Sequence, residues 1–302
     1  MSRWRDVVRI HRLEYPFTIH YLCHAVLGVS YAASDLQQLL TSPVLLVIIA
    51  NLLAIVAGNP LNTAADIATD SHTQGKGDVA SAVLRLGRQQ AIHWAAVEIT
   101  LALLLATILS LWLDRVLIVA SVALTVTLCL LYNLEPVRLK RRGFANPITI
   151  GLCLGLLPSL AGYSAVRPDL DRSAWLIFVG YGTLITARAL WWMIPDRVGD
   201  GATGILTPAV QYGVFRTLSV ACALTVVGLG LFCVGLMWRY GSALALVGGI
   251  VIAAFFVNKL ALLCRVSDDR LPSSQQLRRR SLAPATIADV FLVLLPLASV
   301  GI

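Results

Sequence analysis

The sequence of 302 residues contains little charge. Lys, Arg, Asp and Glu make up 13% of it, whereas a soluble globular domain carries about 25%. Apolar residues make up 58%, and the mean hydropathy is +0.78. The shortage of charge excludes a disordered scaffold, and it argues against a protein that binds nucleic acid despite the net charge of +8. The composition is that of an integral membrane protein.

Three further features are absent. None of the six cysteines belongs to a C-x-x-C pair and each lies in an apolar run, which excludes a disulfide framework and a cysteine metal site. The basic N-terminus is not followed by a small-residue cleavage site, so no removable signal peptide is expected. The apolar runs lack the alternating pattern of a membrane barrel, so the spans must be helices.

A transmembrane helix needs about 20 mostly apolar residues, and nine stretches meet this requirement. They are residues 16–34, 43–65, 91–113, 116–134, 146–166, 174–195, 214–237, 242–264 and 284–302. No linker separates two folded units. We therefore expect an all-α integral membrane protein, a bundle of nine transmembrane helices that forms a single domain over residues 1–302.

The basic residues are unevenly divided between the two sides of this bundle. With nine spans, 18 of the 24 Lys and Arg residues lie in the N-terminal segment and the even-numbered loops, whereas four lie on the other side. Arg188 and Lys259 lie within spans. Because cytoplasmic loops carry the excess of Lys and Arg, we expect a cytoplasmic N-terminus. The long polar loops are on the same side, so we expect the active site there, and the compact chain suggests a bacterial inner membrane.

A polar cluster closes the second expected span. Asn62, Asp66 and Asp70 are spaced four residues apart, so on a helix all three project from one face. Two carboxylates and an amide form an oxygen-rich site that suits Mg²⁺. Acidic residues clustered at a membrane boundary are unfavourable without a partner, which favours a metal site over a solvated helix end.

A second acidic cluster follows the sixth expected span. Asp196 and Asp200 repeat the four-residue spacing, and glycines follow them. Both clusters come after even-numbered spans, so they face the same compartment. Together they suggest two opposed groups of metal ligands that hold Mg²⁺ around a diphosphate.

Basic residues near these clusters are candidates for binding the diphosphate. Lys76 and Arg85 follow the first cluster, and Lys140 lies in the basic turn 138–142, with Tyr132 upstream. Ammonium and guanidinium groups form charge-assisted hydrogen bonds with phosphate oxygens. Lys76 and Lys140 are the strongest candidates, because the two arginines that follow Lys140 are better explained as determinants of topology.

Three ordered motifs resemble those of the UbiA-type intramembrane prenyltransferase superfamily. Asn62-x-x-x-Asp66-x-x-x-Asp70 is similar to its first aspartate-rich motif, and Asp196-x-x-x-Asp200 to its second. The segment from Tyr132 to Lys140, Tyr-Asn-Leu-Glu-Pro-Val-Arg-Leu-Lys, is similar to a conserved segment between them. The resemblance covers nearly the whole chain and implies a UbiA-like fold.

The resemblance implies transfer of an isoprenyl group from a lipidic isoprenyl diphosphate to a small acceptor, usually an aromatic compound or quinone precursor. In this family Mg²⁺ ions hold the diphosphate between the two motifs, which implies metal-binding and catalytic roles for the four aspartates and a metal-binding role for Asn62. Ionisation of the diphosphate gives an allylic cation that the acceptor captures. The family also contains terpene cyclases, in which a double bond of the same chain captures the cation, and the motifs do not distinguish the two activities.

Other polar residues lie inside the spans. Arg188 precedes Asp196 by eight residues, about two turns along the same face, so it either pairs with that acid, contacts the acceptor or forms a structural salt bridge. Asp289 is expected to pair within the bundle, and His20 and His24 to form interhelical hydrogen bonds. A transporter is the alternative from another class, but it predicts acids near the bilayer midplane rather than at one face.

Overall fold

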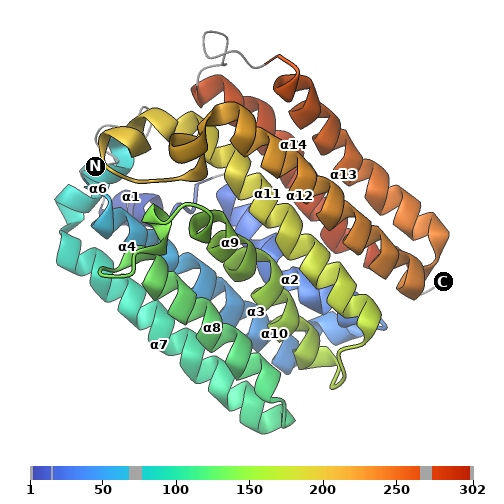
Figure 1. The fold of residues 1–302 in the computed structure, drawn as a ribbon. Helices are drawn as coiled ribbons and strands as arrows, with labels where there is room; N and C mark the ends of the chain where they lie inside the picture. The colour runs from blue at the N-terminus through green and yellow to red at the C-terminus, as the bar shows by residue number, and fades with distance from the viewer. Residues whose placement is uncertain (1–2, 15, 68–76, 266–273, 300–302) are drawn as a thin grey trace.

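The computed structural model describes residues 3–14, 16–67, 77–265 and 274–299. Long helices packed side by side make up these ranges, which contain no β-strand (Figure 1). A bilayer core offers the backbone no hydrogen-bonding partner, so apolar runs of this length satisfy their own N–H and C=O groups as helices. The helical membrane bundle is confirmed.

Most spanning helices overlap the expected stretches, but the last one, expected over residues 284–302, begins earlier, at Ser274, and continues through Pro284. Their bounds are α2 (Phe17–Ala32), α3 (Ser42–Val56) with α4 (Gly58–Ala65), α7 (Arg88–Leu113), α8 (Val116–Asn133), α9 (Ala145–Gly151) with the π-helical η3 (Leu152–Leu156) and α10 (Leu157–Val166), α11 (Arg172–Ala202), α12 (Pro208–Tyr240), α13 (Ser242–Leu263) and α14 (Ser274–Leu294). Eight helical segments of the described chain are long and apolar enough to cross a membrane. The first expected span, α2, has 16 residues and falls short of that length, so the ninth crossing stays a prediction.

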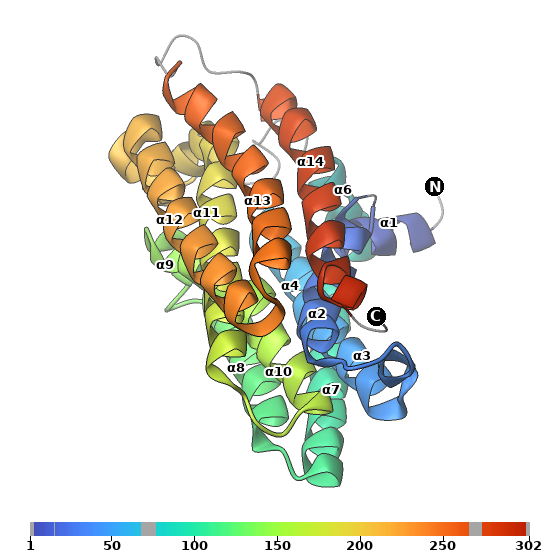
Figure 2. The same ribbon diagram turned by 90° about the vertical axis from the view of Figure 1, so that its right-hand side faces the viewer.

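Two short helices occur where the sequence indicated only polar segments. They are α1 (Arg3–Ile10) and α6 (Gly77–Leu86). In α1, Asp6 and Ile10 are buried whereas Trp4 is exposed, so one face packs on the protein. Figure 2 shows α1 lying crosswise to the long helices and projecting from one side of the bundle.

The expected end of the sixth span is displaced at a proline, whereas a glycine marks the expected start of the seventh. The sixth span was expected to end at Pro195, but α11 continues through this proline to Ala202 and therefore includes both acids of the second motif. Neighbouring helices can satisfy the carbonyl that a proline leaves without its N–H partner, which makes such continuation possible in a membrane bundle. Conversely, α12 breaks at Gly213, whose φ is 80°, so its long apolar part begins at residue 214 as expected.

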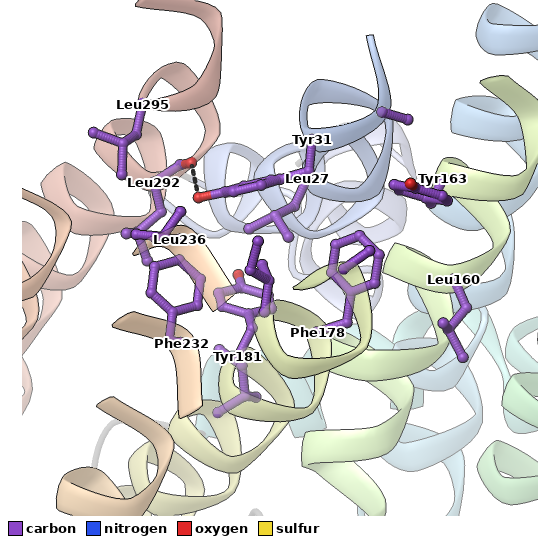
Figure 3. Close-up of a cluster of buried hydrophobic side chains, with 14 of the residues drawn as sticks. Leu27, Tyr31, Leu160, Tyr163, Phe178, Tyr181, Phe232, Leu236, Leu292 and Leu295 are labelled. Atoms are coloured by element: carbon purple, nitrogen blue, oxygen red, sulfur yellow. Dashed lines mark hydrogen bonds between the residues drawn. The ribbon is translucent and has the colours of Figure 1, made fainter. Parts of the chain in front are cut away.

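Two apolar cores share α2 and α10. One joins these helices to α11, α12, α13 and α14, and the other joins them to α3, α7 and α8. Figure 3 shows the first core, in which the Tyr31 hydroxyl donates a hydrogen bond to the Leu292 carbonyl oxygen at 3.1 Å. This bond joins α2 to α14.

Glycines allow the closest helix contacts. A Cβ atom at Gly28 of α2 would lie 2.0 Å from the backbone oxygen of Ser159 in α10, and one at Gly151 would lie 2.6 Å from the carbonyl oxygen of Gly182 in α11. The second contact is at the π-helical segment, a local irregularity that is frequent near functional sites. It holds α11, which carries the second acidic motif, directly against the helix that follows the basic turn.

Candidate active site

Asp66 is the buried acid of the first motif. Helix α4 ends at Ala65, and the Asp66 N–H still donates to the Asn62 carbonyl oxygen at 2.9 Å, so the two residues remain one helical turn apart. The Asp66 side chain is 1% exposed, and its carboxylate accepts from Arg138 Nη2 at 3.0 Å and forms an ion pair with Lys140. Burial raises the pKa of Asp66, but the Lys140 ammonium and the Arg138 guanidinium outweigh that effect and hold it below its ordinary value. Asp66 is therefore ionised at neutral pH.

Asn62 is fixed by two residues that the motif analysis missed. Its Oδ1 accepts from Arg12 Nη2 at 3.1 Å, and its Nδ2 donates to Asn133 Oδ1 at 3.0 Å. Arg12 counted only toward the charge asymmetry, and its φ of 52° gives a turn that sequence periodicity does not reveal. Asn133 ends the apolar helix α8, and a polar residue in that position was a usable signal.

The basic turn after α8 is held in place by a chain of hydrogen bonds. The Tyr132 hydroxyl donates to Asn146 Oδ1 at 3.0 Å, and Asn146 Nδ2 donates to the Lys140 carbonyl oxygen at 2.8 Å. Arg138 adopts a left-handed backbone with φ of 36°, which lets its guanidinium reach back to Asp66 and the carbonyl oxygen of Ala65. Tyr132 therefore positions the turn that presents Lys140.

The second motif lies in the last turns of α11. Asp200 is buried, with 7% exposed, and Asp196 is half-buried one turn earlier. The chain then turns at Gly204, where φ is 69°, and the Gly143 N–H donates to the Leu206 carbonyl oxygen at 2.9 Å. That bond joins the loop after the second motif to the basic turn.

The two motifs open on one end of the bundle. The basic turn contacts both motif regions, through the ion pairs with Asp66 and the hydrogen bond from Gly143 to Leu206. We call the region formed by Asn62, Asp66, the turn 138–142, Asp196 and Asp200 the acidic mouth. Asp70 and Lys76 lie outside the described residues, so their placement stays a prediction.

Two predicted binding residues point elsewhere. Arg85 donates from Nε and Nη2 to the two carboxylate oxygens of Asp6, at 3.0 and 2.6 Å, which ties α6 to α1. Arg188 donates from Nη1 to both oxygens of Asp289, at 2.9 and 2.8 Å. Of the interpretations open for Arg188, this geometry matches the structural salt bridge.

The groups at the acidic mouth fit Mg²⁺ and an anion. Its acids and amide offer oxygen atoms, the ligands that Mg²⁺ prefers. No three His, Cys, Asp or Glu side chains of the described chain are close enough to enclose a metal by themselves. Mg²⁺ usually completes its shell with water and phosphate oxygens. The Nε atoms of Arg138 and Arg141 are buried and have no acceptor among the residues described, so a bound anion would supply one.

A family model described as the UbiA prenyltransferase family matches residues 22–280. The chain belongs to this family. The match spans the first motif, the basic turn and the second motif.

Solved structures share the UbiA fold of this chain. A UbiA homologue from Archaeoglobus fulgidus bound to GPP and Mg²⁺ has a TM-score of 0.76 and 16% identity over 98% of this chain and 100% of that chain. The same homologue bound to DMAPP and Mg²⁺ has a TM-score of 0.75 and 16% identity over 98% and 99%. A structure of digeranylgeranylglyceryl phosphate synthase has a TM-score of 0.64 and 16% identity over 99% and 100%. No curated protein matches the chain.

Proposed function

We propose that this UbiA-family protein is a Mg²⁺-dependent intramembrane prenyltransferase. It moves an isoprenyl group from an allylic polyprenyl diphosphate to an aromatic or quinone-precursor acceptor. The observation that carries the proposal is the acidic mouth, where Asp66, two cationic side chains and the loop after Asp200 meet beside an apolar bundle. The similar archaeal structures, which bind GPP or DMAPP with Mg²⁺, support the same ligands here.

The chain's own residues divide the work of diphosphate binding. Asn62, Asp66, Asp70, Asp196 and Asp200 would hold Mg²⁺, which when bound neutralises charge on the leaving diphosphate. The Asn62 side chain is already oriented by a hydrogen bond from Arg12 and another to Asn133.

The basic turn would bind the phosphate oxygens. Lys140 and Arg138, whose side chains are 14% and 11% exposed, already face the mouth in their ion pairs with Asp66. Tyr132 sets the position of Lys140 through Asn146, and Lys76 would add a further cation. Arg85 acts in the α1–α6 contact instead.

Bond breaking and bond making follow from this arrangement. The C1–O bond of the donor breaks and the diphosphate leaves with the electron pair, while charge at the mouth stabilises it. The acceptor carbon bonds to C1 and then passes its proton to the departing diphosphate. The apolar helix faces below the mouth exclude water from the cation. The excess of basic residues on this side supports a cytoplasmic mouth.

The purified protein should be incubated with geranyl diphosphate, Mg²⁺ and a panel of aromatic acceptors, and the products identified by mass spectrometry. An acceptor that gains one geranyl group supports transfer. A cyclic hydrocarbon released without acceptor would instead support the alternative, a terpene cyclase, and overturn the transferase.

A substitution in the basic turn tests the residue assignment. Lys140→Ala should raise the KM for the donor about tenfold or more without changing the product, because one charge-assisted contact to phosphate is lost. Arg5→Ala is the matched control, since Arg5 is an exposed basic residue on the same side of the protein. An unchanged KM in Lys140→Ala would contradict the phosphate role.

A further inference from the structure

A second polar site lies deeper in the bundle. A partly open cavity of about 60 Å³ is bounded by α11, α12, α13 and α14. One end is apolar and merges with the core of Figure 3, where Tyr181 and Leu292 line it. The other end is lined by Arg188, Lys259 and Asp289. Arg188 precedes Asp196 by eight residues, so this end lies roughly 12 Å from the acidic mouth along α11.

The Asp289 carboxylate already accepts hydrogen bonds from two residues. Asp289 accepts from Arg188 on both oxygens and from His20 Nδ1 at 2.5 Å. Arg188 Nη2 donates to His24 Nε2 at 3.1 Å, and His24 Nδ1 is hydrogen-bonded to the Tyr181 hydroxyl at 2.8 Å. The acid is therefore committed to Arg188 and His20.

Lys259 is the remaining charge. It is 8% exposed, lines the cavity and has neither a hydrogen bond nor an ion pair among the residues that the structure describes. An ammonium group inside a membrane span is unfavourable unless an anion or polar group faces it. The charged side chains that line the cavity therefore carry one uncompensated positive charge.

We infer that this cavity binds the carboxylate head of a lipid-soluble organic acid, with Lys259 as the anion-binding residue. One excess positive charge calls for a monoanion, so a diphosphate belongs at the acidic mouth and not here. The volume also limits the ligand: a dry cavity of about 150 Å³ is known to hold benzene, so about 60 Å³ accommodates a head group rather than a ring.

The source of this carboxylate is a membrane fatty acid, because an acceptor that carries a ring would not fit a cavity of about 60 Å³. The proposal is independent of the proposed function and is tested by binding.

The probe is a palmitic acid analogue that carries a photoreactive diazirine, added to the full-length protein in nanodiscs of phosphatidylcholine. Labelled peptides are mapped by mass spectrometry. We expect saturable labelling of α11–α14, and a half-saturating concentration that rises about tenfold or more in Lys259→Met. Lys259→Arg should retain labelling, and the methyl ester of the probe should label weakly. Equal labelling of wild type and Lys259→Met, or equal labelling by acid and ester, would overturn the proposal.

Two controls keep the result interpretable. Lys259→Met removes a buried, uncompensated charge, so its thermal midpoint without ligand should be equal to or above that of wild type, which shows that the variant folds. Asp66→Asn should lose Mg²⁺-dependent donor binding and keep the labelling, which separates failure of this site from failure of the mouth. Loss of labelling in Asp66→Asn would also overturn the proposal, because the two sites would then be one. After incubation with geranyl diphosphate and Mg²⁺ the probe should be recovered unchanged, and prenylation of the probe would overturn its assignment as a resident lipid.

Discussion

Asp66 and Asp289 are both buried acids at the ends of cationic side chains, yet their surroundings differ. Asp66 lies at the mouth and pairs with Arg138, whose buried Nε atom has no acceptor in the described structure. Asp289 lies inside the bundle, where Arg188 and His20 occupy its oxygens. The cationic groups around Asp66 can therefore bind an additional anion. The groups around Asp289 are already paired with one another.

The Arg188–Asp289 pair predicts that each single substitution lowers stability more than the double substitution does. Arg188→Met and Asp289→Leu should each lower the stability of the protein by about 3–5 kcal/mol, because each leaves a buried charge without its partner. The double variant should recover most of that loss. Thermal unfolding in detergent measures all three, and single variants as stable as wild type would rule out a structural role for the pair.

Helix packing depends on a few glycines. Gly28 lets α2 touch the backbone of α10, the two helices that both apolar cores share. Gly230 in α12 is exposed and has open space where a Cβ atom would be added. A substitution by alanine is therefore expected to affect stability differently at these two positions.

Gly28→Ala should destabilise the protein by about 1–3 kcal/mol, because its new Cβ would lie 2.0 Å from the Ser159 oxygen and force α2 and α10 apart. Gly230→Ala is the matched control and should stay within about 0.5 kcal/mol of wild type. The readout is the thermal midpoint of each variant. Equal midpoints for Gly28→Ala and Gly230→Ala would contradict the close approach of α2 and α10.

The spanning helices were predictable because apolar length alone decides them in a bilayer. The short helices α1 and α6 were not, because each is only partly apolar and depends on a contact between Asp6 and Arg85, 79 residues apart. The same limit applies to the site. Asp66 and Asp200 were recognisable because each belongs to a motif with a four-residue spacing. Arg12 was not, because it reaches Asn62 across 50 residues through a turn that has no sequence signature.

One side of the molecule carries 18 of the 24 Lys and Arg residues and the other side carries four, and the acidic mouth opens on the basic side. Cys264, at the basic-side end of α13, is the exposed member of the six cysteines. The proposed orientation places its thiol at the cytoplasmic face.

A membrane-impermeant maleimide should therefore label inside-out vesicles several times more strongly than intact cells. Cys264→Ser, which removes the exposed thiol, should abolish that difference. Labelling of Cys264 in intact cells would reverse the orientation and place the mouth on the outer face.

The most direct measurement of the mouth is calorimetric titration of geranyl diphosphate into the purified protein, with Mg²⁺ and with EDTA. We expect binding that requires Mg²⁺ and that weakens about tenfold or more in both Asp66→Asn and Asp200→Asn, because both motifs contribute to one diphosphate site. Asp114→Asn, on the opposite side of the bundle, should bind as wild type does. Binding that is as tight with EDTA as with Mg²⁺, or as tight in both motif variants as in wild type, would contradict a shared metal–diphosphate site.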